Sequence, residues 1–111
     1  MLEDRFWGQD IVTDKYHAPD ANYAMTVRDC IIRASTTASG AAFTITLPPV
    51  TEARGRIYSL RMTARNSTKD ITITDCGDSD GWTNITFDLA GDTVLLLSDG
   101  LMWHIIASDG L

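Results

Sequence analysis

The carboxylates that could do chemistry are concentrated in one segment, residues 75–83, with the sequence DCGDSDGWT. Its aspartates and glycines partly match the calcium-binding loop of an EF-hand. Placing Asp78 and Asp80 at loop positions 3 and 5 puts Cys76 at position 1 and Phe87 at position 12, where the bidentate glutamate belongs. This excludes an EF-hand. A looser calcium site and a solvated turn both stay open, since Asp and Gly favour turns for backbone reasons. We predict no bound metal.

One aromatic side chain, Trp82, lies in this polar segment. An exposed indole ring beside Asp78 and Asp80 could contact a glycan or a protein. An indole ring can equally pack over the edge of a β-sandwich, because aromatic side chains gain most from burial. Both interpretations stay open from the sequence.

The two histidines lie outside any catalytic pattern. His17 belongs to the aromatic N-terminal segment, and His104 follows Trp103 in an apolar run. A nucleophile needs a base within hydrogen-bond reach and a third group that orients the base. The chain also lacks a glycine-rich phosphate loop and any Cys or His spacing suited to zinc. We therefore predict that the protein is not an enzyme and uses no cofactor.

Composition and length narrow the possible classes of protein. The 111 residues suit one domain, and 44% hydrophobic residues can supply its core. No apolar run reaches the roughly 20 residues of a membrane helix, and the charged N-terminus has no signal-peptide pattern. A net charge of −6 argues against binding to nucleic acid. Residues 26–64 carry an excess of arginine, which could meet an acidic partner or form an ordinary solvated surface.

Short apolar and polar alternations dominate the chain after residue 25. About seven segments have β-type patterns and are separated by turn residues, which predicts an all-β fold, a small antiparallel β-sandwich or barrel. The segments expected to form strands span residues 26–34, 42–47, 55–64, 70–75, 84–89, 94–97 and 101–106.

Residues 1–25 differ from the rest because no period of two or of 3.6 persists in them. We predict an extended N-terminal arm here and a β-sandwich domain over residues 26–111. The apolar side chains of the arm should dock on their own domain, on a neighbouring copy or on a different protein, since aromatics rarely stay in water. The expected contact residues of the arm are Phe6, Trp7, Ile11, Val12 and Tyr16.

The last two predicted strands flank Ser98-Asp99-Gly100, which is a strong hairpin signal because Gly adopts positive φ without steric cost. Both strands are apolar on both faces, and such strands are usually covered on both faces. The hairpin should therefore lie centrally in a sandwich or at a subunit interface. The expected interface residues are Leu95, Leu97, Leu101, Trp103 and Ile105.

The order of these motifs resembles a small β domain of bacteriophage virion proteins. The resemblance rests on a strand ending in Leu-Pro (45–48), a Glu-Ala-x-Gly turn (52–55), Tyr58, an Ile-Thr-Ile strand (71–73), and a Ser-Asp-Gly hairpin with a tryptophan (98–105). It covers about three-quarters of the chain and consists of turn residues and hydrophobic alternation.

The resemblance implies a structural virion protein, made in the host cytoplasm and located in the virion. A small free-standing protein of this kind is expected to be a capsid decoration (cement) protein, with the major capsid protein and itself, as a homotrimer, for partners. No contact with nucleic acid or membrane is expected. The alternative is a tail-fibre or receptor-binding module that recognises a cell-surface glycan through Trp82, Asp78 and Asp80.

Overall fold

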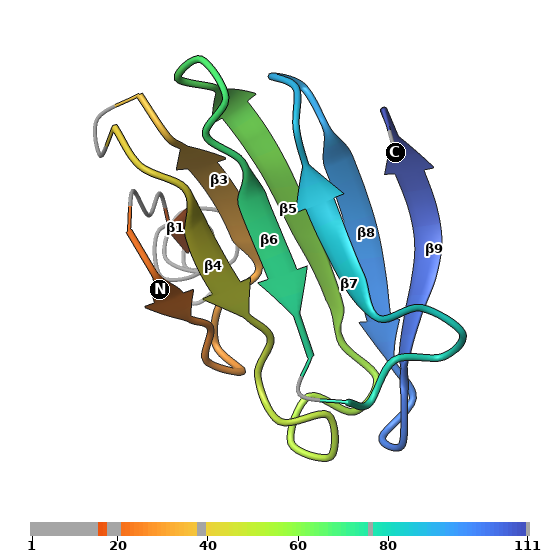
Figure 1. Ribbon diagram of the computed structural model, residues 1–111. Helices are drawn as coiled ribbons and strands as arrows, with labels where there is room; N and C mark the ends of the chain where they lie inside the picture. Colours follow the sequence, from red (N-terminus) through yellow and green to blue (C-terminus); the bar gives the residue numbers. More distant parts are fainter. Residues whose placement is uncertain (1–15, 18–20, 38–39, 76, 111) are drawn as a thin grey trace, which may run out of the picture.

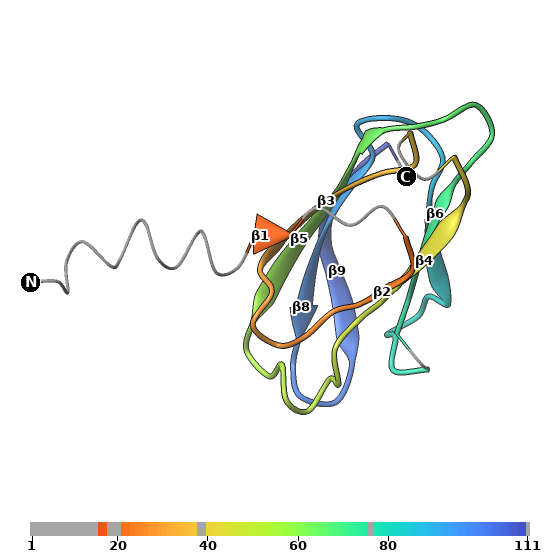
Figure 2. The same cartoon turned by 90° about the vertical axis from the view of Figure 1, so that its left-hand side faces the viewer.

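The computed structural model describes residues 16–17, 21–37, 40–75 and 77–110, which form an all-β fold of two packed sheets (Figure 1; Figure 2). No helix that could cross a membrane occurs in these ranges. The strands are β1 (Tyr16–His17), β2 (Tyr23–Ala24), β3 (Ile31–Ser35), β4 (Phe43–Thr46), β5 (Ile57–Ala64), β6 (Ile71–Thr74), β7 (Asn84–Phe87), β8 (Thr93–Ser98) and β9 (Trp103–Asp109).

The chain crosses from one sheet to the other at each step from β1 to β6. One sheet has the order β1-β3-β5-β8-β9, and the other has the order β2-β4-β6-β7. Strands β1, β3 and β5 are mutually parallel, as are β2, β4 and β6, whereas β7, β8 and β9 join in antiparallel pairs. The predicted sandwich is confirmed, and a closed barrel is excluded by the two separate sheets. The predicted antiparallel arrangement is wrong for the first six strands, because consecutive strands lie in different sheets.

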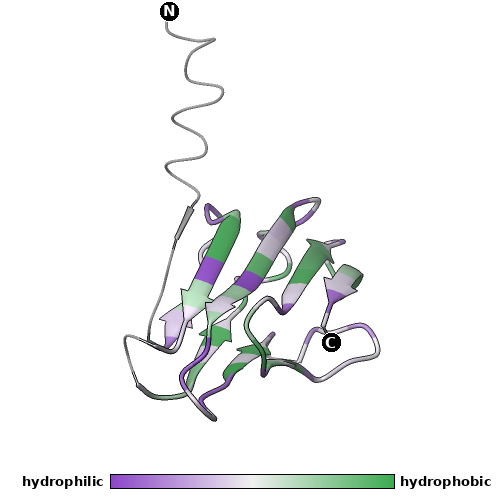
Figure 3. Ribbon diagram, turned by 90° about the horizontal axis from the view of Figure 1, so that it is seen from above, coloured by the Kyte–Doolittle hydropathy of each residue, from purple (hydrophilic) through white to green (hydrophobic). Residues whose placement is uncertain are grey.

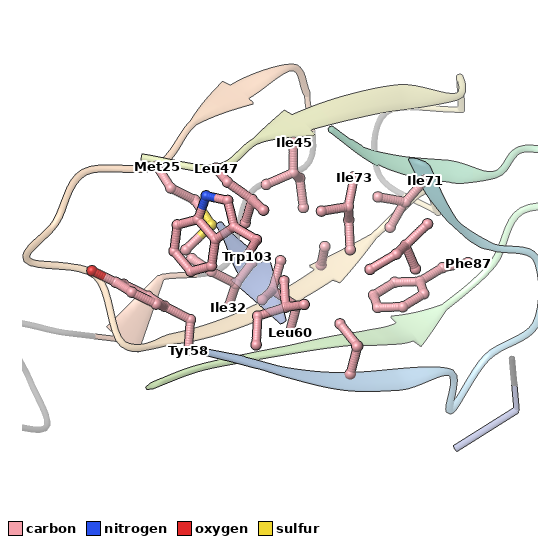
Figure 4. Close-up of a cluster of buried hydrophobic side chains, with 14 of the residues drawn as sticks. Met25, Ile32, Ile45, Leu47, Tyr58, Leu60, Ile71, Ile73, Phe87 and Trp103 are labelled. Carbon is pink, nitrogen blue, oxygen red and sulfur yellow. The ribbon is translucent and has the colours of Figure 1, made fainter. Parts of the chain in front are cut away.

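Alternation along the strands places one set of side chains between the sheets. Figure 3 shows hydrophobic and hydrophilic residues alternating along the strands, and Figure 4 shows the apolar set meeting in the core. Tyr58 and Trp103 meet edge to face, with ring centroids 5.6 Å apart, a geometry that suits aromatic quadrupoles. The fully buried large side chains include Ile32, Ile45, Tyr58, Leu60, Met62, Ile71, Ile73, Phe87, Val94, Leu96 and Trp103.

The sandwich begins before the predicted boundary at Thr26. Strand β2 pairs with β4, and Met25 is only 4% exposed in the core. The strand expected from residue 26 instead starts at Ile31, because residues 26–29 form a turn. In this turn the Asp29 carboxylate accepts hydrogen bonds from the Thr26 amide and from the Tyr23 hydroxyl. Local side-chain bonding thus replaces the first half of the expected strand.

The C-terminal hairpin forms as predicted, with β8 and β9 antiparallel and Gly100 at φ 93°. Its position differs from the central one that its two apolar faces suggested. Strand β9 is the edge strand of the five-stranded sheet, so its free edge has no neighbouring strand among the described residues. The described chain forms two sheets, so no third layer covers the outer face of the hairpin. Val94, Leu96 and Trp103 face the core, whereas Leu95 and Leu97 are half-buried on the outer face.

Candidate functional site

The aspartate-rich loop between β6 and β7 folds against the start of β9. The Trp103 amide donates to the Asp78 carbonyl at 2.8 Å, and the Asp80 amide donates to the Trp103 carbonyl at 3.0 Å. Ser79 forms a parallel bridge with Trp103 between these two bonds. The structure therefore brings the predicted loop residues beside the predicted hairpin residues, at the lower end of the sandwich in Figure 1.

Trp82 is fixed at this junction. Its indole N–H donates to the Trp103 carbonyl at 3.1 Å, and its half-buried ring packs against the core. The ring packs over the edge of the sandwich, which is one of the two interpretations from the sequence. Part of the ring stays accessible, which the other interpretation, contact with a glycan or a protein, requires. A ring held by its own N–H presents its apolar surface, rather than a donor, to any ligand.

Two shallow grooves flank Trp82. The first, of about 340 Å³, runs between the edge strands β7 and β9 and is lined by Asn84, Thr86 and Ile105 in addition to the indole. The second, of about 420 Å³, lies beside the end of β6 and includes Thr74 together with Trp82 and Asn84. Asn84 therefore belongs to both grooves.

The sequence placed Asn84 at the end of the loop expected to contact a glycan, but it did not indicate Thr86 as a groove residue. Both lie on the exposed side of β7, which has the burial pattern exposed, buried, exposed, buried. The sequence feature that could have indicated Thr86 is the alternation of polar and apolar residues that begins at Asn84, two residues after Trp82. Asp78 and Asp80, which the sequence assigned to the Trp82 site, instead hold the loop against β9.

His104 connects this loop to the β8–β9 turn. Its Nδ1 lies 2.9 Å from Asp80 Oδ2, and its Nε2 lies 2.7 Å from Asp99 Oδ2. A neutral imidazole has a single N–H donor, so two carboxylate acceptors match the protonated ring. The hydrogen bond to Asp99 and the two negative charges raise the pKa of His104. The same hydrogen bond, with those from the Met102 and Leu101 amides, lowers the pKa of Asp99 to about 2. We name His104, Asp80 and Asp99 the histidine–carboxylate cluster.

Two of the three carboxylates of the loop, those of Asp75 and Asp80, bind donors of the protein itself. Asp75 is 4% exposed and accepts from the Gly77 amide at 2.9 Å and from the Ser79 hydroxyl. Asp80 accepts from His104. In the described ranges, no three His, Cys, Asp or Glu side chains converge in a way that could hold a metal ion. Cys76 lies outside the described residues.

The five predicted interface residues occupy different environments. Leu95 and Leu97 lie on the outer face of the five-stranded sheet, where cross-strand pairing places Leu97 beside Ile57. Leu101, in the hairpin turn, is 77% exposed, and Ile105 borders the groove beside Trp82. Trp103 has no exposed surface because it fills the core of its own sandwich. In this fold Trp103 offers no contact to another subunit.

Most of the predicted arm contacts, Phe6, Trp7, Ile11 and Val12, lie outside the described residues. Of Tyr16 the structure describes the backbone, which pairs in parallel with Ile31 at the edge of the five-stranded sheet. The chain matches no protein-family model, and no curated protein shows significant similarity to it.

Proposed function

We propose that this protein is a capsid decoration protein that binds the head shell of a phage and associates as a trimer. The proposal combines the sequence resemblance with one structural observation, the concentration of exposed large hydrophobic side chains in neighbouring strands of the five-stranded sheet. Of the six such residues that the described chain contains, all except Leu89 belong to β5 or to the β8–β9 hairpin. These five are Ile57, Leu101, Met102, Ile105 and Ile106.

The outer face of the five-stranded sheet is the best candidate contact surface. Strand register places Ile57 beside Leu97, and it places Ile31 and Leu95 on either side of Ser59. We name these four apolar residues, Ile31, Ile57, Leu95 and Leu97, the apolar face. Exposed apolar patches on small proteins commonly mark interaction sites.

Charge at one end of the apolar face, opposite the end where Leu97 pairs with His104, favours an acidic partner. Arg33 and Arg61 form the neighbouring cross-strand pair on the same side of the sheet. The chain as a whole carries a net charge of −6. Basic residues beside an apolar patch therefore offer complementarity to an acidic surface, including that of a second copy.

Burial would supply the binding energy. At roughly 25 cal/mol per Å² of apolar area, a few hundred Å² per copy gives several kcal/mol before the costs of association. Repetition over a symmetric shell multiplies this gain. A decoration protein of this kind would stabilise the shell against the pressure of packaged DNA.

The test is the copy number of this chain relative to the major shell protein in purified virions, measured by quantitative mass spectrometry. Hundreds of copies in a fixed ratio to the shell subunit are expected. A handful of copies would point to a tail location. Absence of the chain from the particle would contradict both a decoration protein and a tail component.

A matched pair of variants tests the apolar face. Leu97→Glu should abolish both shell binding and self-association in sedimentation velocity, because it buries a charge in the contact. Thr86→Glu, an exposed position on the other sheet, should leave both unchanged. Equal effects of the two substitutions would exclude the apolar face as the contact.

The alternative function, a tail-fibre or receptor-binding module, is supported by the grooves at Trp82. A fixed aromatic ring beside amide and hydroxyl groups suits a glycan better than it suits a shell protein. The copy-number measurement separates the two functions, since a fibre component is present in few copies.

A further inference from the structure

The outer face of the four-stranded sheet is a regular array of hydroxyl and amide side chains. Strands β4, β6 and β7 read FTIT, ITIT and NITF, and their phenylalanines and isoleucines face the core. The alternate positions therefore face solvent. We name this surface the threonine face, and its residues are Thr44, Thr46, Thr72, Thr74, Asn84 and Thr86.

Strand register orders the threonine face into two rows. In one row Thr72 lies between Thr44 and Thr86, and in the other Thr74 lies between Thr46 and Asn84. Neighbouring strands lie about 4.8 Å apart, so each row presents polar groups at a spacing comparable to the width of a sugar ring. Neither row contains a charged residue.

Trp82 adjoins the end of the second row. The groove beside β6 contains both Thr74 and Asn84, which are a cross-strand pair, together with the indole. Two backbone hydrogen bonds to Trp103 fix the loop that carries the ring, and the indole N–H bonds to the same residue. A ring ordered before binding loses little conformational entropy when a ligand stacks on it.

We propose that Trp82 and the adjoining threonine face bind a neutral carbohydrate chain. One sugar ring would stack on the exposed part of Trp82. Its hydroxyl groups would exchange hydrogen bonds with the side chains of Thr74, Asn84 and Thr86. Hydroxyl and amide groups both donate and accept, which matches the mixed donors and acceptors of sugar hydroxyls.

Charge excludes other occupants of this surface. The flanking ionisable side chains, Asp75 in the second groove and Asp88 in the first, are acidic. Arg65, beside the start of β6, is already paired with Asp70 at 2.7 Å. Binding of phosphates depends on available Lys and Arg side chains, so this surface disfavours phosphates and acidic sugars. A protein partner would need buried aromatic or arginine anchors, which the two rows do not contain. The proposal rests on the alternative function above, glycan recognition at the Trp82 grooves, and names its ligand class and contact residues. The surface belongs to the other sheet from the apolar face, so loss of sugar binding and loss of shell binding can be measured separately.

The experiment is a titration of the ¹⁵N-labelled protein with cellohexaose, maltohexaose and chitohexaose, followed by NMR. At least one hexasaccharide should shift the indole N–H signal of Trp82 and the side-chain amide signals of Asn84 at millimolar concentration. Trp82→Ala should abolish the shifts of the Asn84 side-chain amide signals. Because Trp82 also packs on the core, Asn84→Ala and Thr86→Val provide exposed substitutions, and each should weaken binding about tenfold, the effect of losing about 1.4 kcal/mol.

Two control variants distinguish this site from the apolar face. Ser59→Ala removes a hydroxyl from the outer side of the five-stranded sheet and should leave sugar binding unchanged, as should Leu97→Glu. The proposal is overturned if none of the three sugars produces shifts. It is equally overturned if the shifts map to the apolar face, or if Asn84→Ala and Thr86→Val bind as well as the unaltered protein.

Discussion

Trp82 donates its indole N–H to the main-chain carbonyl of Trp103, whereas the indole N–H of Trp103 has no hydrogen-bond partner in the described part of the protein. The two tryptophans thus have opposite roles at one junction. Trp82 closes the edge of the sandwich through a polar bond. Trp103 fills the interior and leaves a buried donor unpaired, which opposes folding by about 1–3 kcal/mol.

Replacing Trp103 by Phe should therefore cost less than its volume suggests. The substitution leaves a cavity, but it also removes the unpaired donor, so we expect a loss of unfolding free energy under about 2 kcal/mol. Trp103→Ala should cost about 3–5 kcal/mol. Urea denaturation of both variants checks this. A loss for Trp103→Phe well above about 2 kcal/mol would show that removing the unpaired indole N–H gives no compensating gain.

The histidine–carboxylate cluster should make stability depend on pH. The pKa of His104 is raised above its usual 6.5, so its contribution is complete below pH 6.5 and is lost as pH rises through the folded pKa. The pKa of Asp99 is lowered from 3.8 to about 2, so its contribution is present above pH 3.8 and is lost as pH falls toward 2. The cluster should stabilise the loop most between pH 3.8 and 6.5.

An NMR titration of the His104 ring protons checks the cluster directly. Asp99→Asn should move the pKa of His104 down toward 6.5, because it removes the largest cause of the shift. Asp109→Asn, at the far end of β9, serves as the control and should leave the midpoint unchanged. If Asp99→Asn leaves the titration midpoint of His104 unchanged, the contact between His104 and Asp99 is contradicted.

Ser98 should contribute to stability through its hydroxyl group. This fully buried side chain donates to the Val50 carbonyl at 2.6 Å and accepts from the Gly100 amide at 3.1 Å. Ser98→Ala leaves both partners unsatisfied in the interior, so we expect a loss of about 1–3 kcal/mol in unfolding free energy. Chemical denaturation measures it, with Ser59→Ala as the exposed-face comparison. An unchanged midpoint would show that water replaces the hydroxyl.

Tyr23 should ionise late in an alkaline titration. Burial, its hydrogen bond to Asp29 and the charge of that carboxylate raise the pKa of Tyr23 from 10.0 to about 12. The neutral phenol therefore stabilises the fold up to about pH 10, and this contribution is lost between pH 10 and 12. The tyrosinate absorbance, compared with that of Tyr23→Phe, reports the midpoint. Asp29→Asn should lower the midpoint while leaving it above 10, since burial is the largest cause.

The strands and their inward faces were predictable because alternation directly reports which side of a strand is buried. Ile45, Leu60 and Ile73 all face the core as their spacing requires. Alternation over the predicted strand 84–89 would place Leu89 on the same inward face as Phe87, yet Leu89 is 60% exposed. The strand ends at Phe87, because the Asp92 carboxylate accepts from the two following amides and forms a turn.

Strand neighbours were not predictable, since alternation carries no information about which strand pairs with which. The parallel pairing of β3 with β5 depends on β4 crossing to the other sheet. For the same reason the groove residues could not be assembled from the sequence. Asn84 meets Thr74 through cross-strand pairing, and Ile105 reaches the Trp82 groove only because β7 and β9 are both edge strands.

The alternation of the chain between sheets also determines the order in which the protein can fold. Among the described strands, only β6–β7 and β8–β9 are neighbours both in sequence and in a sheet. In each of the parallel pairs, the segment that joins the two strands contains a strand of the other sheet. Closing this longer loop slows folding. We expect pulsed hydrogen exchange to show protection of β6–β9 amides before those of β3 and β4. A newly synthesised chain would then acquire its first native pairs only when its C-terminal half emerges from the ribosome.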